Sequence, residues 1–227
     1  MTDATRRWAG AALFDWDGTI VDSKQALVAA WHDVTQEHLG RRWPLDDDDV
    51  RLVLSRRGTE VFPRLSDDPV VVRALEDGFT PAYERHATDG VRPFPGAVAL
   101  LEDLHERGIA VGVVTSKARA RYVADADRGR LAHLVSAVAC AEDVARGKPD
   151  PQAVHQVLEA LDVAADAAVM VGDTGVDIAT GRAAGVASIG VTWGSSDAEA
   201  LRAAGADDVV GSFDELRAAL VRHRLLR

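Results

Sequence analysis

Short runs of apolar residues alternate along most of the chain with segments in which apolar residues recur at helical spacing. Continuous apolar runs are typical of strands buried on both faces, as in parallel sheets covered by helices. The clearest runs are 11–14, 109–114, 134–139, 167–171 and 186–191. Between and after them, helices are predicted at about 96–107, 117–129, 150–161, 176–184 and 213–224. This alternation predicts an α/β doubly wound parallel sheet.

Residues 22–91 interrupt the alternation. Two amphipathic helices are predicted there, at about 26–40 and 68–87, and no strand is predicted between them. The acidic run at 46–49 is interpreted as a solvated helix N-terminus, where the helix dipole favours negative charge. The economical interpretation is an all-helical insert. We therefore expect a core domain of residues 1–21 and 92–227 and a helical domain of residues 22–91.

Composition limits the function classes. The chain has 227 residues, 47% of them apolar, which is enough for a sizeable core and unlike a disordered protein. A net charge of -10 argues against nucleic-acid and anionic-membrane partners, because long-range electrostatics would repel both. An anionic substrate stays compatible with this charge if a bound cation reverses the local sign.

Cys140 is the single cysteine, so no internal disulfide is possible and a reducing compartment is expected. We interpret it as a small buried hydrophobic residue. The first ten residues have no apolar signal region behind their arginines, and no run of about 20 apolar residues is long enough to span a membrane. We therefore expect a cytoplasmic protein. Oligomeric state does not follow from the sequence.

Four polar clusters come shortly after the apolar runs. They are Asp15–Thr19, Thr115–Lys117, Lys148–Pro151 and Gly172–Asp177. If the runs are parallel strands, all four clusters lie at the carboxyl edge of one sheet, where open α/β sheets bind ligands. This convergence predicts a single functional site.

Carboxylates dominate this predicted site. Asp15, Asp17, Asp173 and Asp177 would repel one another in one crevice unless a cation were bound. Oxygen ligands at an open crevice suit Mg²⁺, and no His/Cys pair with zinc spacing competes. Asp15 and Asp17 are two positions apart on an extended segment, which allows one carboxylate to attack while the other manages a proton.

Each cluster also has a simpler structural interpretation when taken alone. Asp17-Gly18 is a common turn signal, and Gly18 allows a sharp turn. The Thr115 hydroxyl can cap a helix, or together with the following N–H groups, Ser116 included, it can bind a phosphoryl oxygen. Lys148 can be a surface lysine or a point charge on a phosphoryl group. The four clusters together favour the functional interpretation.

In this combination the residues resemble the haloacid dehalogenase superfamily. Its first motif is similar to residues 15–23, its second to Thr115, its third to Lys148-Pro149, and its fourth to Gly172-Asp173 with Asp177. The resemblance implies a Rossmann-like core, the helical insert as a cap, and Mg²⁺ as cofactor. Within the superfamily the chain is similar to the phosphoglycolate phosphatase-like subgroup, on the cap and on residues 191–194 and 205–207.

The resemblance also implies roles. Asp15 would be the nucleophile and form an aspartyl-phosphate, and Asp17 would act as acid and base. Thr115 and Lys148 would hold the phosphoryl group. The metal would be bound by Asp15, Asp17, Asp173 and Asp177, with the main-chain carbonyl contributing at Asp17 and with Asp177 acting directly or through water. The expected activity is therefore Mg²⁺-dependent hydrolysis of a small phosphate ester.

Two other functions are weighed against this one. A sugar phosphomutase of the β-phosphoglucomutase type shares the nucleophile and the acid, and Thr19 favours hydrolysis only mildly. A non-catalytic phosphate-binding module would not need the full set of motif residues. Substrate choice is expected to lie in the cap, where Arg56 and Arg57 are candidates for binding an anionic tail, although solvated arginines fit the same pattern.

Overall fold

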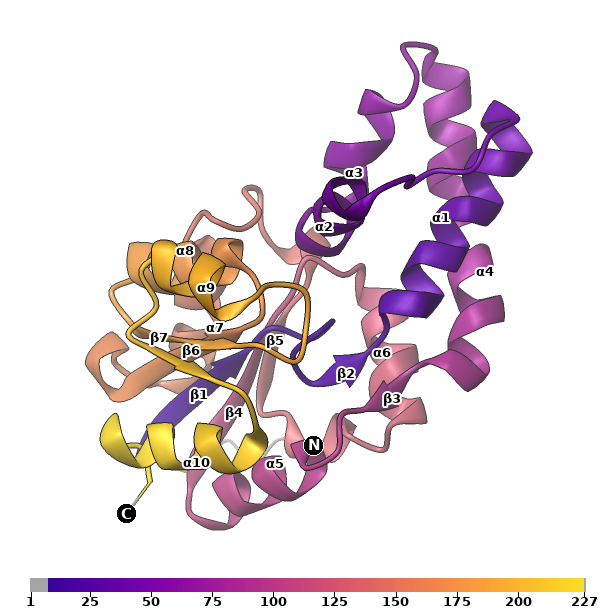
Figure 1. The fold of residues 1–227 in the computed structure, drawn as a ribbon. Coiled ribbons are helices and arrows are strands. Elements are labelled where there is room, and N and C mark those ends of the chain that lie inside the picture. Colours follow the sequence, from indigo (N-terminus) through magenta and orange to yellow (C-terminus); the bar gives the residue numbers. More distant parts are fainter. Residues whose placement is uncertain (1–7, 227) are drawn as a thin grey trace.

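The computed structural model describes residues 8–226. A six-stranded parallel sheet with strand order β5-β4-β1-β6-β7-β8 lies at its centre (Figure 1). The α/β doubly wound sheet predicted from the sequence is thereby confirmed. The strands are β1 (Gly10–Phe14), β4 (Ile109–Val114), β5 (Ala137–Ala139), β6 (Ala168–Gly172), β7 (Ala187–Val191) and β8 (Asp208–Val210).

Strand β1 lies at the point where the strand order reverses. From β1 the chain moves outward through β4 to β5, and it then returns to β6 on the other side of β1. In such sheets a crevice opens beyond the carboxyl ends of the strands at this switch point. Residues that follow β1, β4 and β6 are therefore brought together, although they are far apart in the sequence.

Both faces of the sheet are buried, which explains the continuous apolar runs. Along β1, Ala12 and Phe14 join one hydrophobic cluster, and Ala11 and Leu13 join the other. Helices α5, α6 and α10 contribute to the first cluster, and α7 contributes to the second. The helices of this part are α5 (Ala97–Glu106), α6 (Arg119–Arg128), α7 (Gln152–Leu161), α8 (Gly175–Ala183), α9 (Ala198–Ala203) and α10 (Phe213–Arg222).

The segment between β2 (Val21–Asp22) and β3 (Arg92–Pro93) is helical, and in Figure 1 it rises above the sheet at the upper right. Strands β2 and β3 pair with each other in antiparallel fashion. The segment contains α1 (Lys24–Leu39), α2 (Asp47–Ser55), α3 (Gly58–Val61), the 3-10 turn Phe62–Arg64 and α4 (Pro69–Gly90).

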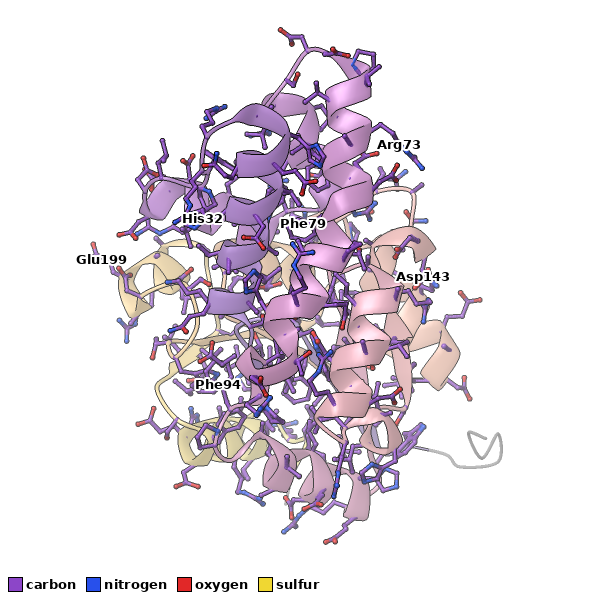
Figure 2. All side chains as sticks on the ribbon, turned by 90° about the vertical axis from the view of Figure 1, so that its right-hand side faces the viewer. His32, Arg73, Phe79, Phe94, Asp143 and Glu199 are labelled. Atoms are coloured by element: carbon purple, nitrogen blue, oxygen red, sulfur yellow. The ribbon has the colours of Figure 1, made fainter. Side chains whose placement is uncertain are left out.

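Aromatic side chains form the centre of these helices. Trp31 of α1 is buried, and its ring centroid lies 4.7 Å from those of both Phe62 and Phe79. Figure 2 labels Phe79 on α4, in the upper part of the molecule, well above Phe94. The amphipathic pattern of residues 22–91 therefore corresponds to helices that pack on one another.

Local signals in the sequence also match the structure. The carboxylate of Asp46 accepts a hydrogen bond from the main-chain N–H of Asp49 and begins α2, so the acidic run does form a helix N-terminus. Gly40 ends α1 in the left-handed conformation, with φ of 68°. Cys140 is fully buried, as expected.

The structure differs from the prediction at several boundaries. Strand β8 and helix α9 were not predicted, because three and six residues are too few to show a period. The run at 134–139 is a strand only over β5, because residues 132–134 form a 3-10 turn. Asp22 belongs to a strand, although no strand was expected there. Across residues 8–226, none of the helices combines the length and the apolar character that crossing a membrane requires.

Candidate active site at the carboxyl edge of the sheet

The carboxyl ends of three adjacent strands supply the centre of the site. Asp15 follows β1, Thr115 follows β4 and Asp173 follows β6. The main-chain N–H of Asp15 donates to the carbonyl of Val171 over 2.9 Å, which extends the pairing of β1 with β6 by one residue. The sheet thus fixes the nucleophile candidate at its middle, as the sequence pattern predicted.

Lys148 joins two of the carboxylates. Its ammonium nitrogen lies 2.8 Å from Oδ1 of Asp15 and 2.5 Å from Oδ1 of Asp177, and it also donates to the carbonyl of Val114 over 3.2 Å. Burial alone would lower the pKa of Lys148, but the two carboxylates outweigh it and raise that pKa above its ordinary value. Lys148 is therefore a buried, charged group and not a surface lysine.

Asp177 lies in the first turn of α8 and performs two structural tasks. Its Oδ2 accepts hydrogen bonds from the N–H and the hydroxyl of Thr174, at 3.1 and 2.6 Å, in a capping box. Its Oδ1 accepts from Lys148. Both oxygens of Asp177 thus accept hydrogen bonds, and Oδ1 helps to hold the ammonium of Lys148 in position.

Asp173 is 1% exposed and is held from two sides. Its Oδ1 accepts from the hydroxyl of Thr19 at 3.2 Å, and its Oδ2 accepts from the N–H of Ser195 at 2.8 Å. Burial, with the nearby charge of Asp177, raises the pKa of Asp173 to about 6. Gly18 has φ of 80°, and a Cβ there would lie 2.4 Å from Oδ2 of Asp173, so glycine is required where the chain turns past this carboxylate.

Asp15, Asp173 and Asp177 each present an oxygen within 4.8 Å of the others, and all three are buried. Burial and the repulsion from Asp177 and Asp173 raise the pKa of Asp15 well above its ordinary value, despite the opposing charge of Lys148. One lysine does not balance three carboxylates. The cluster therefore fits a divalent cation with oxygen ligands.

Asp17 was expected to contact the metal through its main-chain carbonyl, and its side chain has other partners. It accepts hydrogen bonds from the ammonium of Lys117 at 2.6 Å and from the hydroxyl of Ser23. It is also absent from the group of three clustered carboxylates found among residues 8–226. The side chain of Asp17 is thus held by donors of its own, away from that cluster.

Lys117 belongs to a buried polar network that sequence reasoning missed. Besides Asp17, its ammonium group contacts the hydroxyl of Tyr83 and Oδ2 of Asp125, both at 2.9 Å. The Tyr83 hydroxyl donates to Asp125 over 2.7 Å. Tyr83 lies on α4 and Asp125 on α6. The network thus connects the helical segment between β2 and β3 to the rest of the chain, which contains the parallel sheet and is called the sheet-bearing part below. The available signal was that Lys117 is one of only three lysines in an arginine-rich chain.

A cavity that is open to solvent contains most of these groups. Both parts of the chain contribute to its walls. Its lining includes Asp15, Asp17, Thr115, Ser116, Lys117, Arg121, Lys148 and Asp177 from the sheet-bearing part, and Leu27, Trp31, Val53, Arg56 and Phe79 from the helical segment.

The two arginines predicted to bind an anionic tail lie in different places. Arg56 lines the cavity, with its guanidinium 3.6 Å from the carboxylate of Glu60. Arg57 donates to the carbonyl of Val144 over 3.2 Å and packs against Gly147. Arg57 thus contacts the loop that leads to Lys148.

The fold and the site together define a doubly wound α/β enzyme with a cluster of buried carboxylates at its switch point. The chain belongs to the haloacid dehalogenase-like hydrolase family, whose model matches residues 12–191. The resemblance drawn from the motifs is thereby confirmed.

Known relatives narrow the class of hydrolase to which the chain belongs. The chain is 34% identical to a phosphoglycolate phosphatase of Rhodospirillum rubrum over 82% of its own length and 80% of that protein. It is 33% identical to one of Caulobacter vibrioides over 93% and 91% of the two chains. The crystal structure of a hydrolase from Pseudomonas syringae superposes with a TM-score of 0.83 at 25% identity, covering 94% of this chain and 98% of that one. The chain is thus a phosphoric monoester hydrolase of this family.

Proposed function

We propose that this enzyme uses Asp15 to hydrolyse a small phosphomonoester, with Mg²⁺ bound at the carboxyl edge of the sheet. The observation that carries the proposal is the position of Asp15. It lies at the end of the central strand, 2.8 Å from the ammonium of Lys148 and among the clustered carboxylates, in a cavity open to solvent. Phosphoglycolate is the first substrate to test, because the relatives are named for it.

Transfer of the phosphoryl group would begin at a carboxylate oxygen of Asp15. This oxygen forms a bond to phosphorus while the bond from phosphorus to the ester oxygen breaks, which leaves an aspartyl-phosphate. Lys148, with its charge maintained by two carboxylates, would balance charge on the phosphoryl oxygens. The Thr115 hydroxyl and the Ser116 segment, which line the same cavity, would bind those oxygens.

Asp15 and Asp173 are the carboxylates best suited to hold Mg²⁺. They are buried, and their raised pKa values show that the site disfavours their charge when no cation is bound. Asp177 would support the site through Lys148, and Asp17 would contribute its main-chain carbonyl and not its side chain. Bound there, Mg²⁺ would supply positive charge that keeps Asp15 ionised and neutralises the phosphoryl oxygens.

Asp17 is proposed to donate a proton to the leaving ester oxygen and then to take a proton from the water that cleaves the aspartyl-phosphate. Asp17 lines the same cavity as Asp15, which is compatible with both steps. Lys117 and Ser23 would fix its orientation.

The helical segment 22–91 is proposed to act as a cap domain on a core domain of residues 1–21 and 92–227. Side chains of α1, α2 and α4 line the cavity opposite the phosphoryl-binding groups, so they would contact the part of the substrate that is not phosphate. Arg56 would contribute there, whereas Arg57 would steady the loop before Lys148.

The test is phosphate release from a panel of small phosphomonoesters, with Mg²⁺ and with EDTA. We expect release only with metal, and none from Asp15→Asn in either condition. Equal activity in that variant, or full activity in EDTA, would contradict the proposal. The phosphomutase alternative shares Asp15 and Asp17, so sugar phosphates should also be followed for isomerisation. Isomerisation faster than phosphate release would favour the mutase.

A further inference from the structure

Arg121 is a buried cation in the cavity that the mechanism above does not use. It lies on α6, it is 8% exposed, and it lines the same cavity as Asp15 and Lys148. Its Nε is buried without a hydrogen-bond partner. A guanidinium in that position normally has a carboxylate partner, because a buried charge without one is costly.

The carboxylates around Arg121 are occupied by other donors. Three of them are close enough to influence its charge, yet within residues 8–226 none forms an ion pair with it. Asp17 accepts from Lys117 and Ser23, Asp125 accepts from Lys117, Tyr83 and Arg128, and Glu142 accepts from the main-chain N–H of Arg119. Within the described residues, Arg121 therefore has no carboxylate partner of its own.

Aromatic rings hold Arg121 in place without satisfying its donors. Its guanidinium carbon lies 4.8 Å from the ring centre of Phe79 and 5.5 Å from that of Tyr83, both on α4. Such contacts stabilise a cation, but they provide no acceptor for its N–H groups. Burial lowers the pKa of Arg121 below its usual value, which agrees with a charge that lacks a full partner.

The other cations of the cavity differ from Arg121 in this respect. Lys148 is paired with Asp15 and Asp177, and Lys117 is paired with Asp17. Arg56 is near Glu60 and its side chain is 36% exposed, so water solvates it. Among the described cavity residues, Arg121 is therefore the cation best prepared to receive an anion from outside the protein.

We infer that Arg121 is a specificity-determining residue, which binds a second anionic group of the substrate while the phosphoryl group lies at Asp15. This inference rests on the proposed phosphatase function. The planar guanidinium suits a carboxylate or a second phosphate, each of which accepts two parallel hydrogen bonds. The substrate class is thus a short phosphomonoester that carries one of these two groups.

The test compares three phosphomonoesters of similar length, which end in a carboxylate, in the corresponding neutral amide or in a second phosphate. For wild type, kcat/KM should be on the order of 100-fold higher for one anionic ester than for the amide. In Arg121→Gln this ratio should fall to near 1, with little change for the amide itself. Which anionic ester is preferred distinguishes a carboxylate from a phosphate.

Arg119→Gln is the matched control, since Arg119 begins the same helix with an exposed side chain that pairs with Asp143. It should keep the wild-type ratio. The melting temperature of Arg121→Gln should be unchanged or higher, because an unpaired buried charge is removed. A wild type without anionic preference, an equal loss on all three esters, or a preference abolished by Arg56→Gln and kept by Arg121→Gln would each overturn the inference.

Equilibrium binding separates this inference from the phosphatase proposal. In the Asp15→Asn background, the carboxylate-ended and phosphate-ended esters are titrated with and without Arg121→Gln, and the amide serves as reference. Tighter binding of an anionic ester that disappears with Arg121→Gln supports the inference even if no ester is hydrolysed. Equal binding of all three esters would overturn it even if wild type releases phosphate.

Discussion

The ammonium nitrogen of Lys117 lies 2.6 Å from Oδ1 of Asp17, although a hundred positions separate the two residues in the chain. The lysine side chain is 1% exposed, so water does not compete for this contact. The orientation of the proposed acid is therefore set by a residue after β4 and, through the Tyr83 hydroxyl, by helix α4.

Lys117→Met should lower kcat for an alkyl phosphate by roughly 10- to 100-fold, because Asp17 loses the donor that orients it. An aryl phosphate with a good leaving group needs little proton donation and should be affected much less. Steady-state kinetics on the two esters gives the comparison. An equal loss on both esters would mean that Lys117 supports the site in general and does not act through Asp17.

Tyr83→Phe should reduce the free energy of unfolding by about 1–3 kcal/mol, because buried Asp125 and Lys117 each lose a hydrogen-bond partner. Urea unfolding measures the change. Tyr122→Phe is the matched control, since this ring packs edge-on against Trp16 and the variant keeps that packing. If both variants lose the same stability, the hydrogen bonds of the Tyr83 hydroxyl contribute no more than those of a hydroxyl outside the network.

Lys148→Met should abolish phosphate release and also destabilise the protein by about 3–5 kcal/mol, because Asp15 and Asp177 remain buried without their cation. Adding Asp177→Asn should restore part of the stability without restoring activity. The double-mutant cycle is measured by chemical denaturation. Additive losses in the double variant would show that the two side chains are not coupled.

Asp173→Asn should stabilise the metal-free protein at pH 8 by roughly 1–3 kcal/mol. The folded-state pKa of about 6 lies above the unfolded value near 3.8, so wild type loses stability relative to the variant as the pH rises through that window. The Asn side chain can still accept from Ser195 and can donate to the Thr19 hydroxyl. The difference in unfolding free energy between wild type and Asp173→Asn is measured in EDTA at pH values between 4 and 8.

When Mg²⁺ is added, wild type should become more stable than Asp173→Asn. The folded wild type binds the cation more tightly than the variant does, and this binding stabilises the folded state. Asp89→Asn is the control, since its side chain is 98% exposed, and it should show no such reversal. A wild type that Mg²⁺ does not stabilise would argue against a cation at the carboxylate cluster.

The local sequence pattern was sufficient to predict the sheet and those site residues that directly follow its strands. Asp15, Thr115 and Asp173 each follow an apolar run, and a parallel sheet then brings them to one edge without further information. Lys148 became a site residue by the same reasoning, and its contact with Asp15 agrees with that prediction. The short strand β8 was missed, because three residues carry no recognisable alternation.

Contacts between elements that are far apart in the chain could not be predicted from the sequence pattern. Nothing in the pattern of α4 indicates that the Tyr83 hydroxyl meets Asp125 of α6, or that Phe79 covers the guanidinium of Arg121. These pairs depend on how the helical segment sits over the sheet, which no local period encodes. For the same reason the hydrogen bond between the Asp17 carboxylate and the Lys117 ammonium could not be predicted.

The antiparallel pair β2–β3 has an evolutionary consequence. Because Asp22 and Arg92 are partners in this ribbon, the chain leaves the sheet-bearing part and re-enters it at neighbouring points. The segment between them can be exchanged for one of another length or shape without displacing the strand ends that carry Asp15 and Asp173. Such an architecture lets natural selection try new substrates by replacing one contiguous stretch of gene, provided that the new stretch again orients Asp17, as Ser23 and Tyr83 do here.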